Sequence, residues 1–221
     1  QPIADAVKLI FKEDLVPNGV ERVTYTLAPI LSFIPSLLVF AVVPFTQDFT
    51  ILGKPITGVI SDLNIGVLWV FAITGLGVYG IILAGWASNS KYSLLGSNRA
   101  AAQMISYELA LGLSLVPIVM LADSFSIVEI VKAQEKYPFI LVQPFAFVIF
   151  MISAMAESKR IPFDMPEAEN ELGAGYHTEY SGIRFGLFFL GEYVHLQVLG
   201  ALVAVLFLGG WRGPVLPPPV W

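Results

Sequence analysis

Carboxylates gather in one connector of the chain, residues 157–182, at a density that could hold and pass protons. Six of the seventeen acidic residues fall in this connector. Closely spaced carboxylates disfavour one another's charged form, so such a cluster can exchange protons near neutral pH. A solvated acidic loop is the common alternative. Two features argue against a solvated loop. Pro162 and Pro166 fix the backbone. Phe163, Tyr176 and Tyr180 are aromatic residues that a solvated loop does not need.

A further carboxylate, Glu108, lies inside an apolar stretch, eight residues after its start at Ala100. At 1.5 Å per helical residue, this places the carboxylate about 12 Å into the stretch. A charge near the centre of a membrane helix costs roughly 2.5–3.5 kcal/mol on insertion scales, so it faces the bundle interior, pairs, or is protonated. We interpret Glu108 as part of a proton or ligand path, with a hydrogen bond between helices as the structural alternative.

The last apolar stretch carries a polar stripe formed by Arg184, Glu192 and His195, whose spacings of eight and three place them on one helical face. Glu192 and His195 also match the Glu-x-x-His pattern of di-iron bundles. Those bundles need a second copy of the pattern and two further glutamates on other helices. The chain has no second copy, so we predict no metal site and no catalytic residue acting alone.

These residues belong to a chain of 221 residues that is 56% hydrophobic and 13% charged, with a mean hydropathy of +0.76. Soluble globular chains are roughly 25% charged, so the composition predicts a membrane protein. The net charge of −5 and the lack of any basic run exclude a nucleic-acid-binding protein. The absence of cysteine excludes disulfides, thiolate-ligated zinc and iron–sulfur clusters within this chain.

Five stretches are long and apolar enough to cross a bilayer, which takes about 20 helical residues. They are about 27–45, 63–87, 100–122, 139–156 and 183–208. We therefore expect an all-α fold, a polytopic transmembrane helix bundle that forms a single membrane domain over residues 1–221. Residues 1–14 are predicted to form an amphipathic helix in the membrane interface, because its apolar residues share one helical face: Ile3, Ala6, Val7, Ile10 and Phe11.

The Lys and Arg residues predict the orientation, because they are enriched in cytoplasmic connectors. Eight of the twelve fall in residues 1–26, 88–99 and 157–184. We expect Gln1 and the connectors 88–99 and 157–182 to face the cytoplasm.

Several of these segments together resemble the quinone-site membrane subunit of respiratory complex I, which is known as the H subunit in bacteria and as subunit 1 in mitochondria. The most specific are Pro-Phe-Asp-Met-Pro-Glu-Ala-Glu, residues 162–169, and His-Thr-Glu-Tyr-Ser-Gly, residues 177–182. The Tyr-Ser-Leu-Leu-Gly-Ser-Asn-Arg run from residue 92, Ile-Ser-Tyr-Glu at 105–108 and the opening eight residues add to the match. The resemblance runs to about Trp211. In such proteins one span precedes this region and two or more follow it, so the chain is expected to be the central part.

The resemblance implies a large assembly in a bacterial inner membrane or its organelle equivalent. Partner subunits oxidise NADH through FMN and iron–sulfur clusters, and this chain forms the membrane half of a chamber in which quinone, arriving from the lipid, is reduced. The chamber and its entrance are then expected at Lys8, Phe11, Arg160, Phe163, Asp164, Phe185 and Phe189. The acidic path toward the proton-pumping subunits is expected at Glu108, Glu157, Asp164, Glu167, Glu169, Glu171, Glu179 and Glu192.

Some bacterial relatives of this kind carry a further glutamate where this chain reads Thr74-Gly75-Leu76, which leaves the route through the second span open. Two other functions are considered. One is the membrane anchor of an energy-converting hydrogenase, which quinone-dependent turnover would argue against. The other is a cation transport subunit without a redox role, which association with iron–sulfur subunits would argue against.

Overall fold

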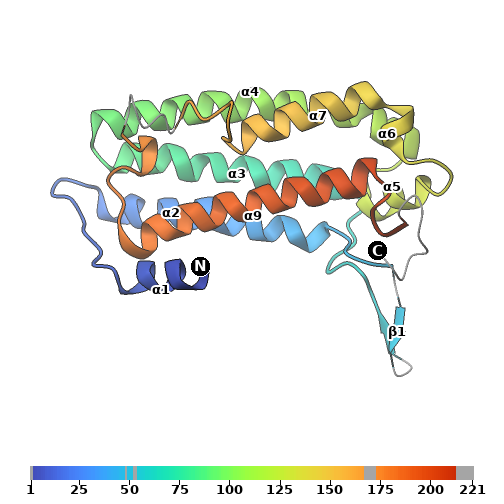
Figure 1. Cartoon of the computed structure of the whole chain (residues 1–221), viewed down its shortest axis with the longest axis horizontal. Helices are drawn as coiled ribbons and strands as arrows, with labels where there is room; N and C mark the ends of the chain where they lie inside the picture. Colours follow the sequence, from blue (N-terminus) through green and yellow to red (C-terminus); the bar gives the residue numbers. More distant parts are fainter. Residues whose placement is uncertain (1, 48, 52–53, 167–172, 213–221) are drawn as a thin grey trace.

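The structure is a computed structural model that describes residues 2–47, 49–51, 54–166 and 173–212. Helices dominate these residues (Figure 1). The helices are α1 (Pro2–Phe11), α2 (Arg22–Val39), η1 (Phe40–Val42), α3 (Gly66–Ala87), α4 (Lys91–Ala122), α5 (Ile127–Ala133), α6 (Phe139–Val142), α7 (Pro144–Glu157), η2 (Gly175–His177), α9 (Gly182–Phe207) and η3 (Gly210–Arg212). One short antiparallel hairpin pairs β1 (Phe49–Ile51) with β2 (Lys54–Ile56).

Four of these helices are long and apolar enough to cross a membrane: α2 continued by η1, then α3, α4 and α9. The predicted all-α polytopic bundle is thereby confirmed, and the chain is an integral membrane protein. Helix α4 has 32 residues, about 48 Å at 1.5 Å per residue. It begins at Lys91 and not near residue 100 as predicted, because its first nine residues include several polar side chains and were assigned to a connector by their composition.

The predicted span over residues 139–156 is divided, so the expected number of five spans is not confirmed. Its first turn is α6, and α7 follows after a break at Gln143. Pro144 explains the break, because a proline disfavours the helical region at the preceding residue, and Gln143 has φ −129° and ψ 60°. With 14 residues, about 21 Å, α7 is shorter than a bilayer core of about 30 Å.

The helices pack so that α3 lies against α2 and α4, while α9 lies against α2 and α7 lies against α4 (Figure 1). The larger apolar core is built around Ile118, Phe150 and Phe207. A second core contains Tyr25, Tyr176 and Phe188, and therefore joins the transmembrane helices to the segment before α9.

The two ends of the bundle differ in structure. Helix α1, the α3–α4 turn and the segment leading into α9 lie at one end, whereas the hairpin, α5, α6 and η3 lie at the other (Figure 1). The described parts of the two connectors predicted to be cytoplasmic, 88–99 and 157–182, are therefore at the same end as α1. Helix α1 packs against the start of α9, where Leu9 approaches Gly186. Its apolar residues Ile10 and Phe11 are exposed, at 60% and 85%.

Candidate functional site

A small polar cavity lies where α2, α3, α7 and α9 meet the segment that follows α7. Its volume is about 40 Å³, which exceeds the roughly 10–15 Å³ that a buried water needs. Ser32, Ser36 and Thr74 line it from α2 and α3. The charged or titratable residues that line it are Glu157, Lys159, Tyr176, Glu192 and His195. Because these groups converge inside an otherwise apolar bundle, the cavity is the candidate site.

Glu157, the last residue of α7, is one of the most buried acids among the described residues. Its side chain is 6% exposed, and its Oε1 lies 3.3 Å from Nε2 of His195, which is 14% exposed. The short length of α7 places this carboxylate within the bundle rather than at its surface. The pair therefore joins an acid of α7 to a titratable base of α9.

Glu192 lies one helical turn before His195 on α9 and is paired with a fixed positive charge. Its Oε1 is 3.2 Å from a guanidinium nitrogen of Arg160, and the Glu192 side chain is only 10% exposed. The same guanidinium lies over the ring of Tyr193, 5.0 Å from the centroid. Arginine is always protonated in proteins, so this contact places a permanent positive charge beside Glu192.

Glu108 projects from α4 toward α3 at a position that glycine keeps open. A Cβ atom at Gly75 would lie 3.1 Å from Glu108 Oε1. Glu108 is close enough to Glu157 and His195 to interact with their charges. Its other side lines an apolar groove of about 720 Å³ between α3 and α4. A glutamate at residue 75 would therefore compete with Glu108 for the same space.

Aromatic residues form a continuous strip along one face of α9. Phe185 and Phe189 have ring centroids 4.6 Å apart, and Phe189 and Tyr193 are 6.5 Å apart. His177 packs edge-on against Phe185 and Phe189, at 5.3 and 5.8 Å. The i, i+4 spacing of the three α9 residues explains why their rings meet. The strip ends at Tyr193, where Arg160 lies over the ring.

His177 is buried under this strip, with 5% of its surface exposed. Burial, and after it the positive charge of Lys159, lowers the pKa of His177 to about 4. The imidazole is therefore neutral at pH 7. Lys159 is itself buried, and its Nζ donates a hydrogen bond of 3.1 Å to the hydroxyl of Tyr176.

Hydrogen bonds and a ring contact hold Phe163 and the start of the connector against α4. The side-chain amide of Gln103 donates hydrogen bonds of 2.7 Å to the carbonyl oxygens of Ala156 and Phe163. The ring of Phe163 meets Tyr107 edge-on, with centroids 5.5 Å apart. Asp164, the next residue, is exposed at the surface of the chain.

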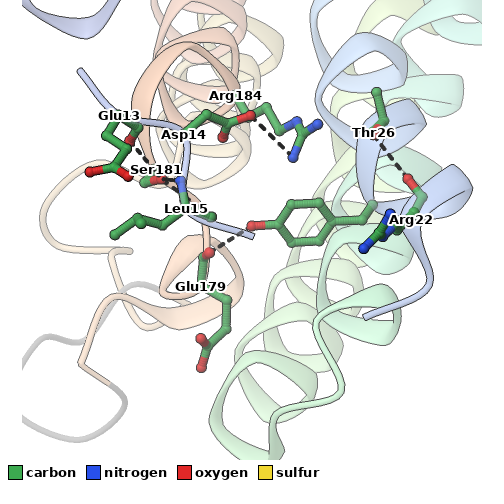
Figure 2. Close-up of polar contacts among 9 residues, drawn as sticks. Glu13, Asp14, Leu15, Arg22, Thr26, Glu179, Ser181 and Arg184 are labelled. Atoms are coloured by element: carbon green, nitrogen blue, oxygen red, sulfur yellow. Dashed lines mark hydrogen bonds and ion pairs between the residues drawn. The ribbon is translucent and has the colours of Figure 1, made fainter. Parts of the chain in front are cut away.

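A second set of polar contacts ties the segment after α1 to the start of α9 (Figure 2). Asp14 lies 3.3 Å from a guanidinium nitrogen of Arg184, and the backbone N–H of Leu15 donates to the Ser181 hydroxyl at 2.8 Å. The Tyr25 hydroxyl donates to the backbone carbonyl of Glu179 at 2.6 Å. Figure 2 shows the Glu179 carboxylate pointing away from this contact.

The structure brings together only part of the predicted acidic path. Glu157 and Glu192 line the cavity, and Glu108 lies close enough to Glu157 to interact with its charge. Asp164 is exposed, and Glu179 contributes its backbone to another contact. The other three predicted acids lie outside the described residues: Glu167, Glu169 and Glu171.

The predicted polar stripe on α9 is divided, because Arg184 faces Asp14 while the other two members reach the cavity. Sequence reasoning left His195, Lys159 and Tyr176 out of the candidate site, although they line the cavity. The spacing of three between Glu192 and His195 was the available signal for His195. Tyr176 was noted only as an aromatic residue of the connector, and no sequence pattern marked Lys159. Both residues reach the cavity from the connector between α7 and α9, where helical spacing does not predict which side chains meet.

The fold and the site define a polytopic α-helical membrane protein with buried acidic groups around an internal polar cavity. The model of a family described as NADH dehydrogenase matches residues 1–221. The chain belongs to this family. It is similar to H subunit 2 of the NADH-quinone oxidoreductase of Syntrophobacter fumaroxidans, with 70% identity over all of this chain and 67% of that protein. The corresponding H subunit of Syntrophotalea carbinolica is 59% identical and H subunit 2 of Geobacter sulfurreducens is 58% identical, with the same coverage.

Proposed function

We propose that this chain is the membrane subunit of a proton-pumping NADH-quinone oxidoreductase that forms the membrane side of the quinone chamber. It also supplies an acidic path that links quinone reduction to proton translocation. The observation that carries the proposal is a series of neighbouring charged groups at the cavity. Arg160 pairs with Glu192, and His195 pairs with Glu157. Glu108 interacts with the charges of Glu157 and His195 from α4. Relatives named as the H subunit of NADH-quinone oxidoreductase match the chain over its whole length.

The chain works as one part of an assembly and holds no redox cofactor itself. Partner subunits in the membrane and in a peripheral arm carry FMN and iron–sulfur clusters and oxidise NADH. Quinone is the substrate and enters from the membrane lipid. The end of the bundle that contains α1 and the 157–182 connector faces the cytoplasm, which agrees with its larger number of Lys and Arg residues.

The quinone chamber lies along the aromatic strip of α9. Phe185 and Phe189 give it an apolar wall suited to a quinone ring and its isoprenoid tail, and Arg160 places a positive charge at the end of the strip. Lys8 and Phe11 of α1 are exposed beside the start of α9 and form the lipid-side entrance. Phe163 and Asp164 complete the chamber from the connector.

The acidic path begins at the connector, with Asp164, Glu167, Glu169, Glu171 and Glu179, and enters the bundle at Glu192 and Glu157. Glu108 is its last member in this chain. Reduction of a quinone to a quinol takes up two electrons and two protons. Charge that appears in the chamber is felt by buried carboxylates nearby far more than it would be in water. This coupling lets quinone reduction change the protonation of Glu192 and Glu157.

Two substitutions test this function in the complete complex. Glu157→Gln and Asp164→Asn are each expected to slow NADH-driven quinone reduction and its coupled proton pumping by about tenfold or more, because positioned proton-transfer groups contribute on the order of 10²–10⁴-fold. Oxidation of NADH by a water-soluble electron acceptor should keep its normal rate, because that reaction does not use the membrane subunit.

The matched control is Glu135→Gln. Glu135 is an exposed acid at the opposite end of the bundle, where it pairs with Arg212 at 2.9 Å. This variant should retain both activities. Equal loss of quinone reduction and of water-soluble acceptor reduction in the test variants would mean failed assembly, and unchanged quinone reduction would contradict the proposed path.

A further inference from the structure

His195 occupies a position between two acids of the cavity. Glu157 faces it from α7, with Oε1 at 3.3 Å from Nε2, and Glu192 precedes it by one turn on α9. All three side chains line the cavity of about 40 Å³. The imidazole therefore connects α9 to the last residue of α7.

The two acids differ in what balances their charge. Glu192 faces Arg160, whose charge is permanent, whereas Glu157 faces an imidazole whose charge depends on a proton. The other charged groups around His195 are Lys159 from the connector and Glu108 from α4. The polar side chains that α2 and α3 contribute to the cavity are uncharged hydroxyl groups, from Ser32, Ser36 and Thr74.

The Nε2 atom of His195 is closed off from the surface and makes no hydrogen bond of good geometry among the described residues. The carboxylate of Glu157 is nevertheless within ion-pair distance of it. A small rotation of either side chain would convert this contact into a hydrogen bond along which a proton could move. Imidazole suits such a transfer, because its proton affinity is the closest of any side chain to neutral pH.

We propose that His195 is a proton carrier of the acidic path and delivers protons from the cavity to Glu157; this inference rests on the function proposed above. A protonated cavity water gives its proton to the free ring nitrogen of His195, while the Nε2 proton passes to Oε1 of Glu157. An O–H bond of the protonated water breaks as the new N–H bond forms. The Nε2–H bond breaks as an O–H bond forms on Glu157, so the carboxylate becomes a carboxylic acid. The imidazole is neutral before and after the transfer, so no unpaired positive charge is left in the bundle.

The test uses the complete complex in liposomes and measures NADH-driven quinone reduction and proton uptake. His195→Gln keeps a polar side chain but cannot carry a proton at neutral pH. It should lower both rates by about tenfold or more, with normal oxidation of NADH by a water-soluble acceptor. The exchanged pair, His195→Glu with Glu157→His, restores one imidazole and one carboxyl and should recover most of the lost rate.

The matched control is Val198→Ala, which loosens the packing of α9 one turn further along at a fully buried residue outside the cavity. It should leave both rates within about twofold of the parent complex. Normal pumping in His195→Gln would overturn the proposal, as would a loss that Val198→Ala shares or that the exchanged pair does not relieve. Failure of the unsubstituted complex to reduce quinone would instead refute the proposed function.

Discussion

Gln103 holds the start of the acidic connector, so Gln103→Leu should release that segment without disturbing α4. The side-chain amide donates two hydrogen bonds of 2.7 Å, to the carbonyls of Ala156 and Phe163. A hydrogen bond of this kind contributes about 0.5–1.5 kcal/mol, so the two together contribute about 1–3 kcal/mol. Since 1.4 kcal/mol is a factor of ten, the open state of residues 158–163 should become about 5- to 150-fold more populated.

Hydrogen–deuterium exchange of the purified complex measures this opening directly. The amide of Phe163 donates to the Arg160 carbonyl at 2.6 Å and reports on the closed segment. Its exchange should accelerate by the same factor in Gln103→Leu. Ser106→Ala is the matched control, because this hydroxyl donates only to a carbonyl one turn back in α4, at 2.7 Å. Unchanged exchange in an assembled Gln103→Leu complex would refute the reasoning.

Three further predictions concern the segment before α9. Gly96→Ala should destabilise it by about 1–3 kcal/mol, because a Cβ there would lie 2.7 Å from Gly175 Cα. Gly200→Ala, at a helical position with open space around it, should not destabilise the protein, and thermal unfolding compares the two. Tyr25→Phe removes the 2.6 Å hydrogen bond to the connector and should lower the unfolding free energy by about 0.5–1.5 kcal/mol, measured in the same way. Burial lowers the pKa of His177 from 6.5 to about 4, so the unfolded state takes up a proton at a higher pH than the folded state. The unfolding free energy should therefore be unaffected by the titration of His177 above pH 6.5 and should fall as the pH drops from 6.5 to 4. His177→Gln should flatten the dependence of unfolding free energy on pH in that range.

The length of α7 has a direct consequence for the chemistry of the site. A helix of 14 residues ends inside the bundle, so the connector starts among transmembrane helices and not in water. Glu157, Ser158 and Lys159 are all buried as a result. The start of the acidic connector therefore lies among the transmembrane helices.

The sequence predicted the bundle because a bilayer imposes a simple rule on composition. Each spanning helix needs about 20 apolar residues, and backbone groups in lipid must bond within their own segment. The long helices α3 and α9 begin within a few residues of the predicted positions. The sequence did not predict that the fourth apolar segment is divided. A proline at residue 144 is compatible both with a kink inside one span and with the first turn of a shorter helix.

The sequence also selected Glu108, Glu157 and Glu192, because a carboxylate in or beside an apolar helix is costly and so marks a role. It did not predict their partners. Spacing along one helix orders side chains on a face, as with Glu192 and His195, but distances between helices come from how the helices pack. Only the tertiary structure decided that His195 pairs with Glu157 and that Arg160 pairs with Glu192. It also decided that Glu108 packs against α3 at Gly75, where there is no side chain.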